Sequence, residues 1–266
     1  MRTALTIAGS DSGGGAGIQA DLKTFAAYGV YGASAITAVT AQNTTGVVAV
    51  APLEADLVTL QIETVAGDLV VHATKVGMLA TAAIVEAVAA AIEALDLPLV
   101  VVDPVIAAST GDRLLEADAV QALCAELLPL ARVVTPNIPE AEVLSGVRIR
   151  SLDDAHEAAK RIRDLGPRAV VITGGHSGIA HSGSRITDLL LDGDDWHEYT
   201  VARVDSPPLH GTGCTYASAI AAGLALRRGL PEAAEDAQQY VAGAIRSAVA
   251  VGRGRVPVNH FWRLRT

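Results

Sequence analysis

Short apolar runs alternate with longer segments of helical period along most of this chain. Apolar runs of about four to eight residues, rich in β-branched side chains, are typical of strands buried on both faces. Between them, apolar residues recur every three or four positions, which is typical of helices with one buried face. The alternation predicts an α/β fold in which helices flank both faces of a central, mostly parallel sheet. No linker, repeat or low-complexity tract interrupts it, so we expect residues 1–266 to form a single domain.

The individual elements follow from the same pattern. The predicted strands are Thr3–Ala8, Ala33–Ala41, Val47–Ala51, Ala73–Met78, Leu99–Val102, Arg132–Thr135 and Ala169–Thr173, followed by a hairpin of Ile186–Leu191 and Trp196–Val201. The predicted helices carry Ile18 to Ala26, Leu53 to Leu60, Ile84 to Ile92, Ala117–Leu128, Leu152–Leu165, Thr212–Arg227 and Pro231–Val251. Thr81 is placed to cap the third of these helices.

Composition and charge narrow the class of protein. Half of the residues are hydrophobic (50%) and 18% are charged, which permits a substantial core and excludes general disorder. A formal net charge of -9 argues against a nucleic-acid partner or an anionic membrane surface, although a local basic pocket remains compatible with it.

Cysteine usage and the longest apolar stretches indicate the compartment. The two cysteines, Cys124 and Cys214, are too few for a disulfide scaffold and are expected to be thiols in a reducing cytosol. The longest apolar stretch is broken by Asp103 and Pro104, so we expect no membrane span. The short apolar run that ends at Gly9 predicts a first strand and not a signal peptide. We therefore expect a cytoplasmic protein.

In parallel sheets, ligands bind where the carboxyl ends of the strands meet, so the loops after the strands are the candidate sites. The first such loop runs from Gly9 to Gly17 and holds five glycines, whose backbone N–H groups can approach a ligand closely. It lacks the Gly-Lys-Ser/Thr of a phosphate-binding P-loop, and no acidic residue lies between Asp21 and Glu54 where a dinucleotide site needs one. The loop is either a tight turn or a ligand contact.

Gln42 closes the second predicted strand. Its amide offers an acceptor and a donor in one plane, which matches the ring nitrogen and amino group of an aminopyrimidine, and the same geometry recognises adenine. The alternative is that Gln42 bonds the backbone of its own loop.

Two acidic residues follow later strands. Asp103 and Glu140 can hold a hard cation that bridges nucleotide phosphates, directly or through water. Glu140 is equally explained as a first-turn helix acid that the helix dipole favours.

The last candidate is the segment His210-Gly211-Thr212-Gly213-Cys214 at the start of a long apolar helix. Small residues there leave N–H donors pointing outward, which suits phosphate or developing negative charge. We expect this field to lower the pKa of Cys214. The alternative for Cys214 is a small buried hydrophobe.

Seven segments in this order resemble the hydroxymethylpyrimidine and phosphomethylpyrimidine kinases of thiamin biosynthesis, which are members of the ribokinase-like superfamily. They are AGSDSGGGAGIQADLKTF from Ala8, AITAVTAQNTTGV from Ala35, KVGML from Lys75, DPV from Asp103, TPNIPEAEVLSG from Thr135, TGGH from Thr173 and HGTGCT from His210. The resemblance spans nearly the whole chain. It implies ATP-dependent phosphorylation of 4-amino-5-hydroxymethyl-2-methylpyrimidine and then of its monophosphate, with ATP and Mg²⁺ as cofactors, and a homodimer.

The resemblance also implies residue roles. Gly9, Asp21, Gln42 and Met78 correspond to the pyrimidine pocket. Asn137, Thr173, Gly175 and Asp103 correspond to the nucleotide and phosphate contacts, and Glu140 to the magnesium motif. Gly211, Thr212, Gly213 and Cys214 correspond to the anion hole, where Cys214 stands in place of the Asp base of many relatives.

One departure and two alternatives remain. The family often carries Lys at the position of Thr173, so a charge that would contact ATP phosphates is missing and must come from Arg, a metal ion or the helix dipole. The resemblance leaves open pyridoxal kinase activity, alone or beside the pyrimidine activity, because both substrates are heteroaromatic rings with a hydroxymethyl group. A non-catalytic sensor of vitamer or nucleotide is the alternative of another class.

Overall fold

The computed structural model describes residues 1–106, 117–174 and 184–264. Its strands are β1 (Thr3–Asp11), β2 (Tyr31–Asn43), β3 (Gly46–Pro52), β4 (Ala73–Val76), β5 (Val100–Val102), β6 (Val133–Val134), β7 (Ala169–Ile172), β8 (Arg185–Asp192), β9 (Asp195–Ala202), β10 (Leu209–His210) and β11 (Val256–Pro257). Its helices are α1 (Gly17–Ala27), α2 (Ala55–Asp68), α3 (Ala82–Ala94), α4 (Ala117–Ala122), α5 (Ile138–Ser145), α6 (Leu152–Arg163), α7 (Thr212–Ala225) and α8 (Leu230–Arg246).

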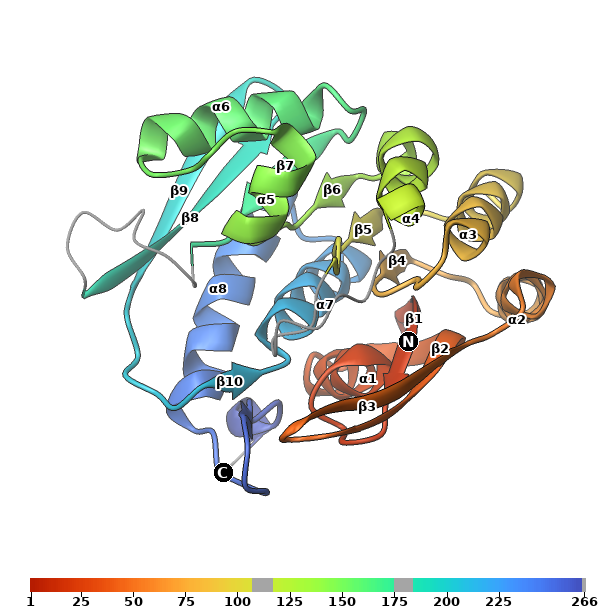
Figure 1. Cartoon of the computed structure of the whole chain (residues 1–266), viewed down its shortest axis with the longest axis horizontal. Coiled ribbons are helices and arrows are strands. Elements are labelled where there is room, and N and C mark those ends of the chain that lie inside the picture. The colour runs from red at the N-terminus through yellow and green to blue at the C-terminus, as the bar shows by residue number, and fades with distance from the viewer. Residues whose placement is uncertain (107–116, 175–183, 265–266) are drawn as a thin grey trace.

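A nine-stranded sheet in the order β3-β2-β1-β4-β5-β6-β7-β8-β9 forms the centre of the molecule (Figure 1). The strands from β2 to β7 in this order are parallel. β3 at one edge of the sheet, and β8 and β9 at the other, are antiparallel to their neighbours. The predicted mostly parallel α/β sheet is therefore confirmed, and so is the hairpin, which β8 and β9 form.

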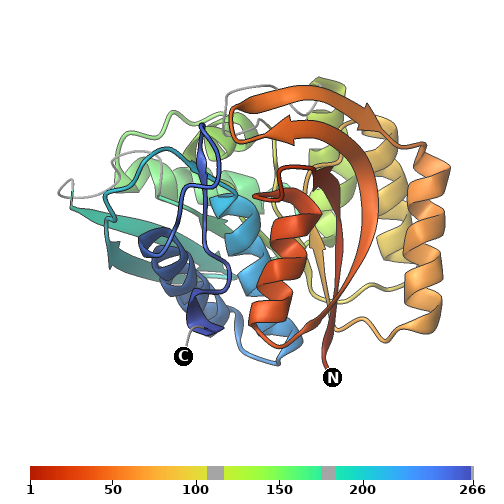
Figure 2. The ribbon, with the colours of Figure 1, turned by 90° about the horizontal axis from the view of Figure 1, so that it is seen from below.

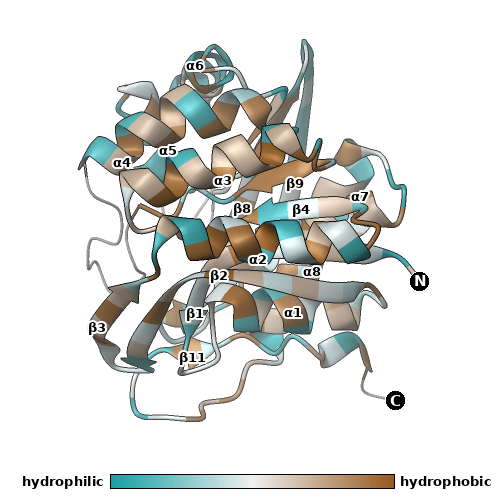
Figure 3. Ribbon diagram, turned by 90° about the vertical axis from the view of Figure 1, so that its right-hand side faces the viewer, coloured by the Kyte–Doolittle hydropathy of each residue, from teal (hydrophilic) through white to brown (hydrophobic). Residues whose placement is uncertain are grey.

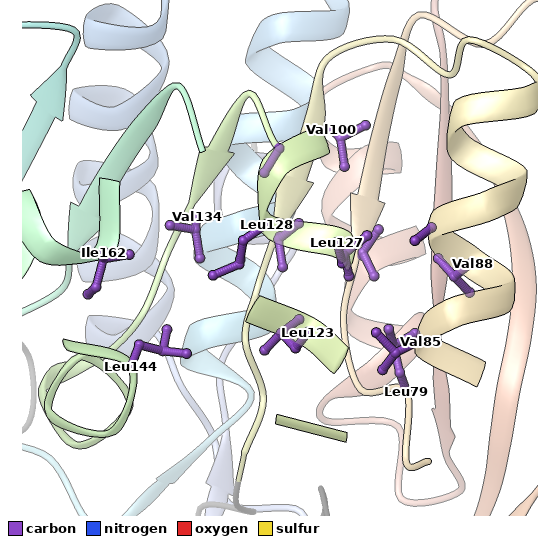
Figure 4. Close-up of a cluster of buried hydrophobic side chains, with 14 of the residues drawn as sticks. Leu79, Val85, Val88, Val100, Leu123, Leu127, Leu128, Val134, Leu144 and Ile162 are labelled. Atoms are coloured by element: carbon purple, nitrogen blue, oxygen red, sulfur yellow. The ribbon is translucent and has the colours of Figure 1, made fainter. Parts of the chain in front are cut away.

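Helices cover both faces of the sheet (Figures 1 and 2). One face packs against α2, α3, α4, α5 and α6, and the other against α1, α7 and α8. All residues of β4, β5, β6 and β7 are buried, which explains why the sequences of β5, β6 and β7 are continuous apolar runs. Figure 4 shows part of the first core, where Leu123, Leu127 and Leu128 lie between Val88 on α3 and Val134 on β6.

The outer helices are amphipathic, and Figure 3 shows hydrophilic and hydrophobic positions side by side along α2, α3 and α6. On α6 the buried residues are Ala155, Ala158, Ala159 and Ile162, a spacing that gives one apolar face. The predicted cap of α3 is confirmed, because the Thr81 side chain accepts a hydrogen bond from Ile84 N. In the part of the chain that the structure describes, no helix combines the length and apolarity that a bilayer crossing requires.

Two predicted helix ends were wrong. The helix expected over 117–128 stops at Ala122 and continues as a π-helical turn, Leu123–Leu127, and a 3₁₀ turn, Leu128–Leu130. Pro129 lies in that last turn and has no N–H to continue α-helical bonding. The last helix ends at Arg246 and not at Val251, because the chain turns back there: Asn259 N bonds Ala244 O, and Val256 pairs with Leu209 between β11 and β10.

Candidate active site

The loops predicted to carry chemistry lie together at one edge of the sheet. Asp103 follows β5 directly and donates its N–H to Val76 O at the end of β4, 2.8 Å away. Thr135 N bonds Val102 O, and Thr173 N bonds Pro136 O. Each loop is thus tied to the end of the strand or loop beside it, as expected where parallel strands end together.

The start of α7 is an open turn. Gly211 precedes the helix with φ +84°, a left-handed conformation that favours glycine. A side chain at this position would collide with the carbonyl oxygen of Gly15, so the glycine-rich loop packs directly on the turn. Gly213 is exposed, and Thr212 is partly exposed. The N–H groups of a first helical turn have no partner within the helix, so these residues can offer donors to an anion.

Cys214 follows this turn, but its predicted electrostatics were wrong. Burial raises the pKa of the thiol to about 12, and the neighbouring Asp103 and Asp21 carboxylates add to the rise. Lys75 and the N–H of Gly17 act in the opposite direction and do not outweigh these effects. The prediction of a lowered pKa counted only the helix dipole and could not include the acidic neighbours. At neutral pH Cys214 is a thiol.

Lys75 is a buried cation at the centre of the site. The residue stands on β4 beside Thr6 of β1, and its ammonium lies 3.0 Å from Asp21 Oδ2 and 4.0 Å from Asp103 Oδ2. Asp21 also accepts hydrogen bonds from the hydroxyls of Thr6 and Ser218, both at 2.6 Å. Burial alone would lower the pKa of Lys75, but the charges of Asp21 and Asp103 raise it above its ordinary value.

Asp21 therefore differs from its predicted place in the pyrimidine pocket. Its side chain is 0% exposed, and Thr6, Lys75 and Ser218 surround it. In this arrangement Asp21 holds Lys75 in position and presents no surface to a ligand. The family motif indicates the residue but does not distinguish a contact with substrate from a contact with the lysine behind it.

Asp103 and Glu140 are two buried carboxyl groups whose negative charges repel each other. Burial raises the pKa of Asp103 to about 6, with Lys75 opposing the rise. Burial and repulsion from Asp103 raise the pKa of Glu140 to about 8. Asp103 Oδ2 is buried, and among the described residues no donor hydrogen-bonds it. Both carboxylates would be stabilised by a cation between them.

Mg²⁺ fits this acidic pair by the chemistry of its donors. Mg²⁺ prefers oxygen ligands and is commonly held by one or two carboxylates together with substrate phosphates. The orphaned Oδ2 of Asp103 is a donor of that kind, and the Asp103 carboxylate also faces Gly213, 3.9 Å from where a side chain on that glycine would begin. The described residues include no cluster of three or more His, Cys, Asp or Glu side chains that would hold a metal by themselves. The remaining ligands would have to come from phosphate and water.

Asn137 and Glu140 form a capping box at the start of α5. Asn137 Oδ1 accepts from Glu140 N at 3.0 Å, and Glu140 Oε2 accepts from Asn137 N at 2.9 Å. The alternative interpretation of Glu140 as a first-turn helix acid therefore agrees with the structure, and the backbone N–H of Ile106 also hydrogen-bonds the Glu140 carboxylate. Thr173 lies beside Asn137 through a β-bridge, so the structure brings these two predicted nucleotide contacts together. Gly175 lies outside the described residues.

The predicted substrate residues Gly9, Met78 and Gln42 lie at the ends of neighbouring strands: Gly9 on β1, Met78 just after β4 and Gln42 on β2. Gly9 N bonds Met78 O at 3.2 Å, and any side chain at position 9 would collide with the Met78 methyl group. The Gln42 amide lies 3.2 Å from His210 Nε2, one residue before the Gly211 turn. Gln42 and the start of α7 are thus neighbours, as one substrate spanning both would require.

Sequence reasoning gave no role to three polar residues of this site, Lys75, Asp11 and His210. Lys75 was quoted only within the KVGML segment, although a lysine inside a fully buried strand must be paired and is itself a signal of function. Asp11 accepts from the N–H groups of Gly13, Gly15 and Ala16 and contacts His210 Nε2 at 2.9 Å. No single-sequence signal links Asp11 to His210, which lies 199 positions away.

Comparison with known proteins gives the same family as the motifs. The model of the family "Phosphomethylpyrimidine kinase" matches residues 11–259. A hydroxymethylpyrimidine/phosphomethylpyrimidine kinase from Rhizobium meliloti is 50% identical over 264 residues, covering 98% of this chain and 97% of that protein.

Solved structures agree. Pyridoxal kinase from Bacillus subtilis, in an ADP complex, has a TM-score of 0.89 and 39% identity and covers 100% of both chains. Phosphomethylpyrimidine kinase from Clostridium difficile has a TM-score of 0.81 and 40% identity, covering 92% of this chain and 100% of the other. The ribokinase-like architecture expected from the motifs is confirmed. With its sheet, its acidic pair and its open helix start in place, this chain belongs to the phosphomethylpyrimidine kinase family.

Proposed function

We propose that this protein transfers the γ-phosphoryl group of ATP to the hydroxymethyl group of 4-amino-5-hydroxymethyl-2-methylpyrimidine, and then to the resulting monophosphate. The observation that carries the proposal is the contact between the Gln42 amide and His210, which sets a group suited to an aminopyrimidine edge beside the open start of α7. The names of the relatives and the ADP complex of a structural neighbour support the same chemistry.

In the proposed reaction the protein mainly positions its substrates and stabilises charge. The substrate oxygen attacks the γ-phosphorus, the bond from that phosphorus to the bridging oxygen breaks, and ADP leaves. Gln42 orients the ring, and the N–H groups of Gly213 and Cys214 bind the equatorial oxygens of the migrating group. Mg²⁺, when held at Asp103 and Glu140, would neutralise phosphate charge.

The hydroxyl proton of the first step needs an acceptor, and the structure changes which group is suited to it. Cys214 cannot accept a proton while it is a thiol with a pKa of about 12. The Asp103 carboxylate lies close enough to Cys214 for a hydrogen bond from the thiol to lower the pKa of Asp103. We therefore assign the proton to Asp103, either directly or by a relay in which Cys214 passes its own proton on and takes up the hydroxyl proton.

A coupled assay of ADP production tests the proposal, with the aminopyrimidine alcohol, its monophosphate and pyridoxal offered separately. We expect turnover of the first two. Turnover of pyridoxal alone would overturn the substrate assignment, and binding of ATP without ADP production would leave a sensor. Turnover of all three would extend the proposal to dual use, consistent with the pyridoxal kinase among the structural neighbours.

Gln42→Leu tests the pocket itself. The variant leaves ring polar groups unpaired, at a cost of about 1 to 3 kcal/mol each, so kcat/KM should fall by about tenfold or more. Gln121→Leu on α4 is the matched control, because Gln121 is exposed and should leave the rate unchanged. Unchanged affinity in Gln42→Leu would place the pyrimidine elsewhere.

We also infer a cytoplasmic homodimer. The edge strand β3 exposes Val48 and Val50 (82% and 38%), and Val39 of β2 is 46% exposed. Apolar side chains on an exposed edge strand favour pairing with another chain. Light scattering should give twice the chain mass, and Val48→Lys should shift the protein toward monomer. A wild-type monomer at micromolar concentration would contradict the dimer.

A further inference from the structure

Asp11, Gln42 and His210 form a polar cluster beside the start of α7. His210 Nε2 lies 2.9 Å from Asp11 Oδ2 and 3.2 Å from the amide nitrogen of Gln42. On its other side, Gln42 Oε1 lies 3.1 Å from the hydroxyl of Thr40, which also lies 3.0 Å from the carbonyl oxygen of Ser10. The cluster joins the ends of β1 and β2 to the residue that precedes Gly211.

The hydrogens available do not fit this orientation of the Gln42 amide. Burial alone would raise the pKa of Asp11, but hydrogen bonds from His210 and from the N–H groups of Ala16 and Gly13 lower it below its ordinary value. Asp11 is therefore ionised and only accepts, so His210 Nε2 must carry a hydrogen. That N–H then faces the NH₂ group of Gln42, where two donors meet.

The Thr40 side has the complementary conflict. Its hydroxyl has one hydrogen, but two oxygens, Gln42 Oε1 and Ser10 O, lie within bonding distance. The oxygen and nitrogen of an amide occupy nearly the same space, so a half-turn of the group exchanges them without moving a neighbour. After that half-turn Thr40 donates to Ser10 O and accepts from Gln42, and His210 N–H is shared by Asp11 and the Gln42 oxygen. Both conflicts disappear.

We propose that Gln42 works with its amide oxygen toward His210 and its amide nitrogen toward Thr40, and that Asp11 and His210 are positioning residues that hold this orientation. Asp11 fixes the hydrogen on His210 Nε2, and that hydrogen fixes the amide oxygen. The second N–H and the second oxygen lone pair of the Gln42 amide then remain for the substrate, and their relative positions are fixed.

This inference rests on the proposed substrate class. A ring nitrogen beside an exocyclic amino group presents an acceptor next to a donor. An amide of fixed orientation can hydrogen-bond both groups only when the ring lies with one particular face up. Reversing the amide would require the ring to turn over, which carries its hydroxymethyl group away from the start of α7. Asp11 and His210 thereby determine which part of the ring reaches the phosphoryl group. A pyridine ring without an amino group beside its nitrogen depends less on this order.

A double-mutant cycle tests whether His210 acts through Gln42. We expect His210→Leu to lower kcat/KM for the aminopyrimidine alcohol about tenfold or more, to affect pyridoxal less if pyridoxal is turned over, and to leave KM for ATP unchanged. His210→Gln, whose amide N–H can replace Nε2–H, should retain most of the activity. In a Gln42→Ala background, His210→Leu should have little further effect. Additive losses, or loss of ATP affinity in His210→Leu, would overturn the positioning role.

Nitrogen-15 NMR of the full-length protein, without ligand, tests the hydrogen on His210 directly. We expect Nε2 to carry a hydrogen, and we expect a scalar coupling across its hydrogen bond to Asp11 or Gln42. An unprotonated Nε2 would overturn the proposal whatever the activity. If the wild-type protein phosphorylates no aminopyrimidine, the proposed function fails, whereas this measurement still decides the orientation of Gln42.

Discussion

Replacing Lys75 with Met should destabilise the fold through charge and not through volume. Lys75 and Asp21 are both 0% exposed, 3.0 Å apart, and Met is close to Lys in length. Removing one partner of a buried pair costs about 3 to 5 kcal/mol, because the other charge is left uncompensated. Asp21 keeps the hydroxyl bonds of Thr6 and Ser218, so we expect the lower end, about 3 kcal/mol. For 266 residues the unfolding entropy is about 0.6 kcal/mol/K, which converts this loss to a Tm lowered by about 5 °C.

Urea and thermal unfolding followed by circular dichroism measure this loss. Lys160→Met is the control, because Lys160 is an exposed lysine on α6 and should change stability little. The double variant Asp21→Asn/Lys75→Met removes both charges and should recover part of the loss. A cost below about 1 kcal/mol, or a double variant as unstable as the sum of the two single variants, would refute the view that Asp21 and Lys75 are held by each other.

Three further predictions concern titration, reactivity and nucleotide binding. Without divalent cations, Tm should fall as pH rises from about 5 to 8. The reason is that the folded state holds protons on Asp103 (pKa about 6) and Glu140 (pKa about 8) more tightly than the unfolded chain does. Asp188, whose pKa is also raised to about 6, adds to the fall. Mg²⁺ should raise Tm more at pH 8 than at pH 6, and Glu140→Gln should reduce that difference. An equal rise in Tm at both pH values would contradict the assignment of Asp103 and Glu140 as the cation-binding pair. Cys214 should react with iodoacetamide at pH 7.5 at least about 100-fold more slowly than free cysteine, and rapid labelling seen by intact mass would refute its raised pKa. Thr173→Lys should lower KM for ATP about several-fold through a charge-assisted contact, and an unchanged KM would show that this position does not reach phosphate.

The sheet could be predicted from the sequence because its strands are buried on both faces. The three consecutive valines of β5 are typical of a short strand buried on both faces. Because the strands are parallel, the residues that follow them, Asp103, Asn137 and Thr173, lie together at the carboxyl ends of the strands. Helix ends were predicted less well. A periodic pattern continues through Leu123–Leu127, where the structure has a π-helical turn, because apolar spacing does not record which carbonyl each N–H reaches.

The polar interior of the site could not be predicted in the same way. Local sequence shows that Lys75 stands in a buried strand, but not that its partner is Asp21, 54 positions earlier on α1. The Cys214 thiol was misjudged for a related reason: the helix start is visible in the sequence, whereas Asp103 and Asp21 reach Cys214 only through the fold. Charge interactions between distant segments depend on tertiary contacts, and one sequence without those contacts gives only the residue types.

The distribution of charge in the site has a consequence for how phosphate is bound. The motif resemblance leads us to expect a lysine at the position of Thr173, and Lys75 cannot take its place, because Asp21 holds the ammonium where it is fully buried. The acidic pair of Asp103 and Glu140 would repel a nucleotide if both carboxylates were ionised without a cation. Burial and mutual repulsion raise both pKa values, so a cation bound by this pair would displace protons from it. We therefore expect cation binding and phosphate binding to be coupled in this chain, with the backbone donors at the start of α7 adding to the attraction for phosphate.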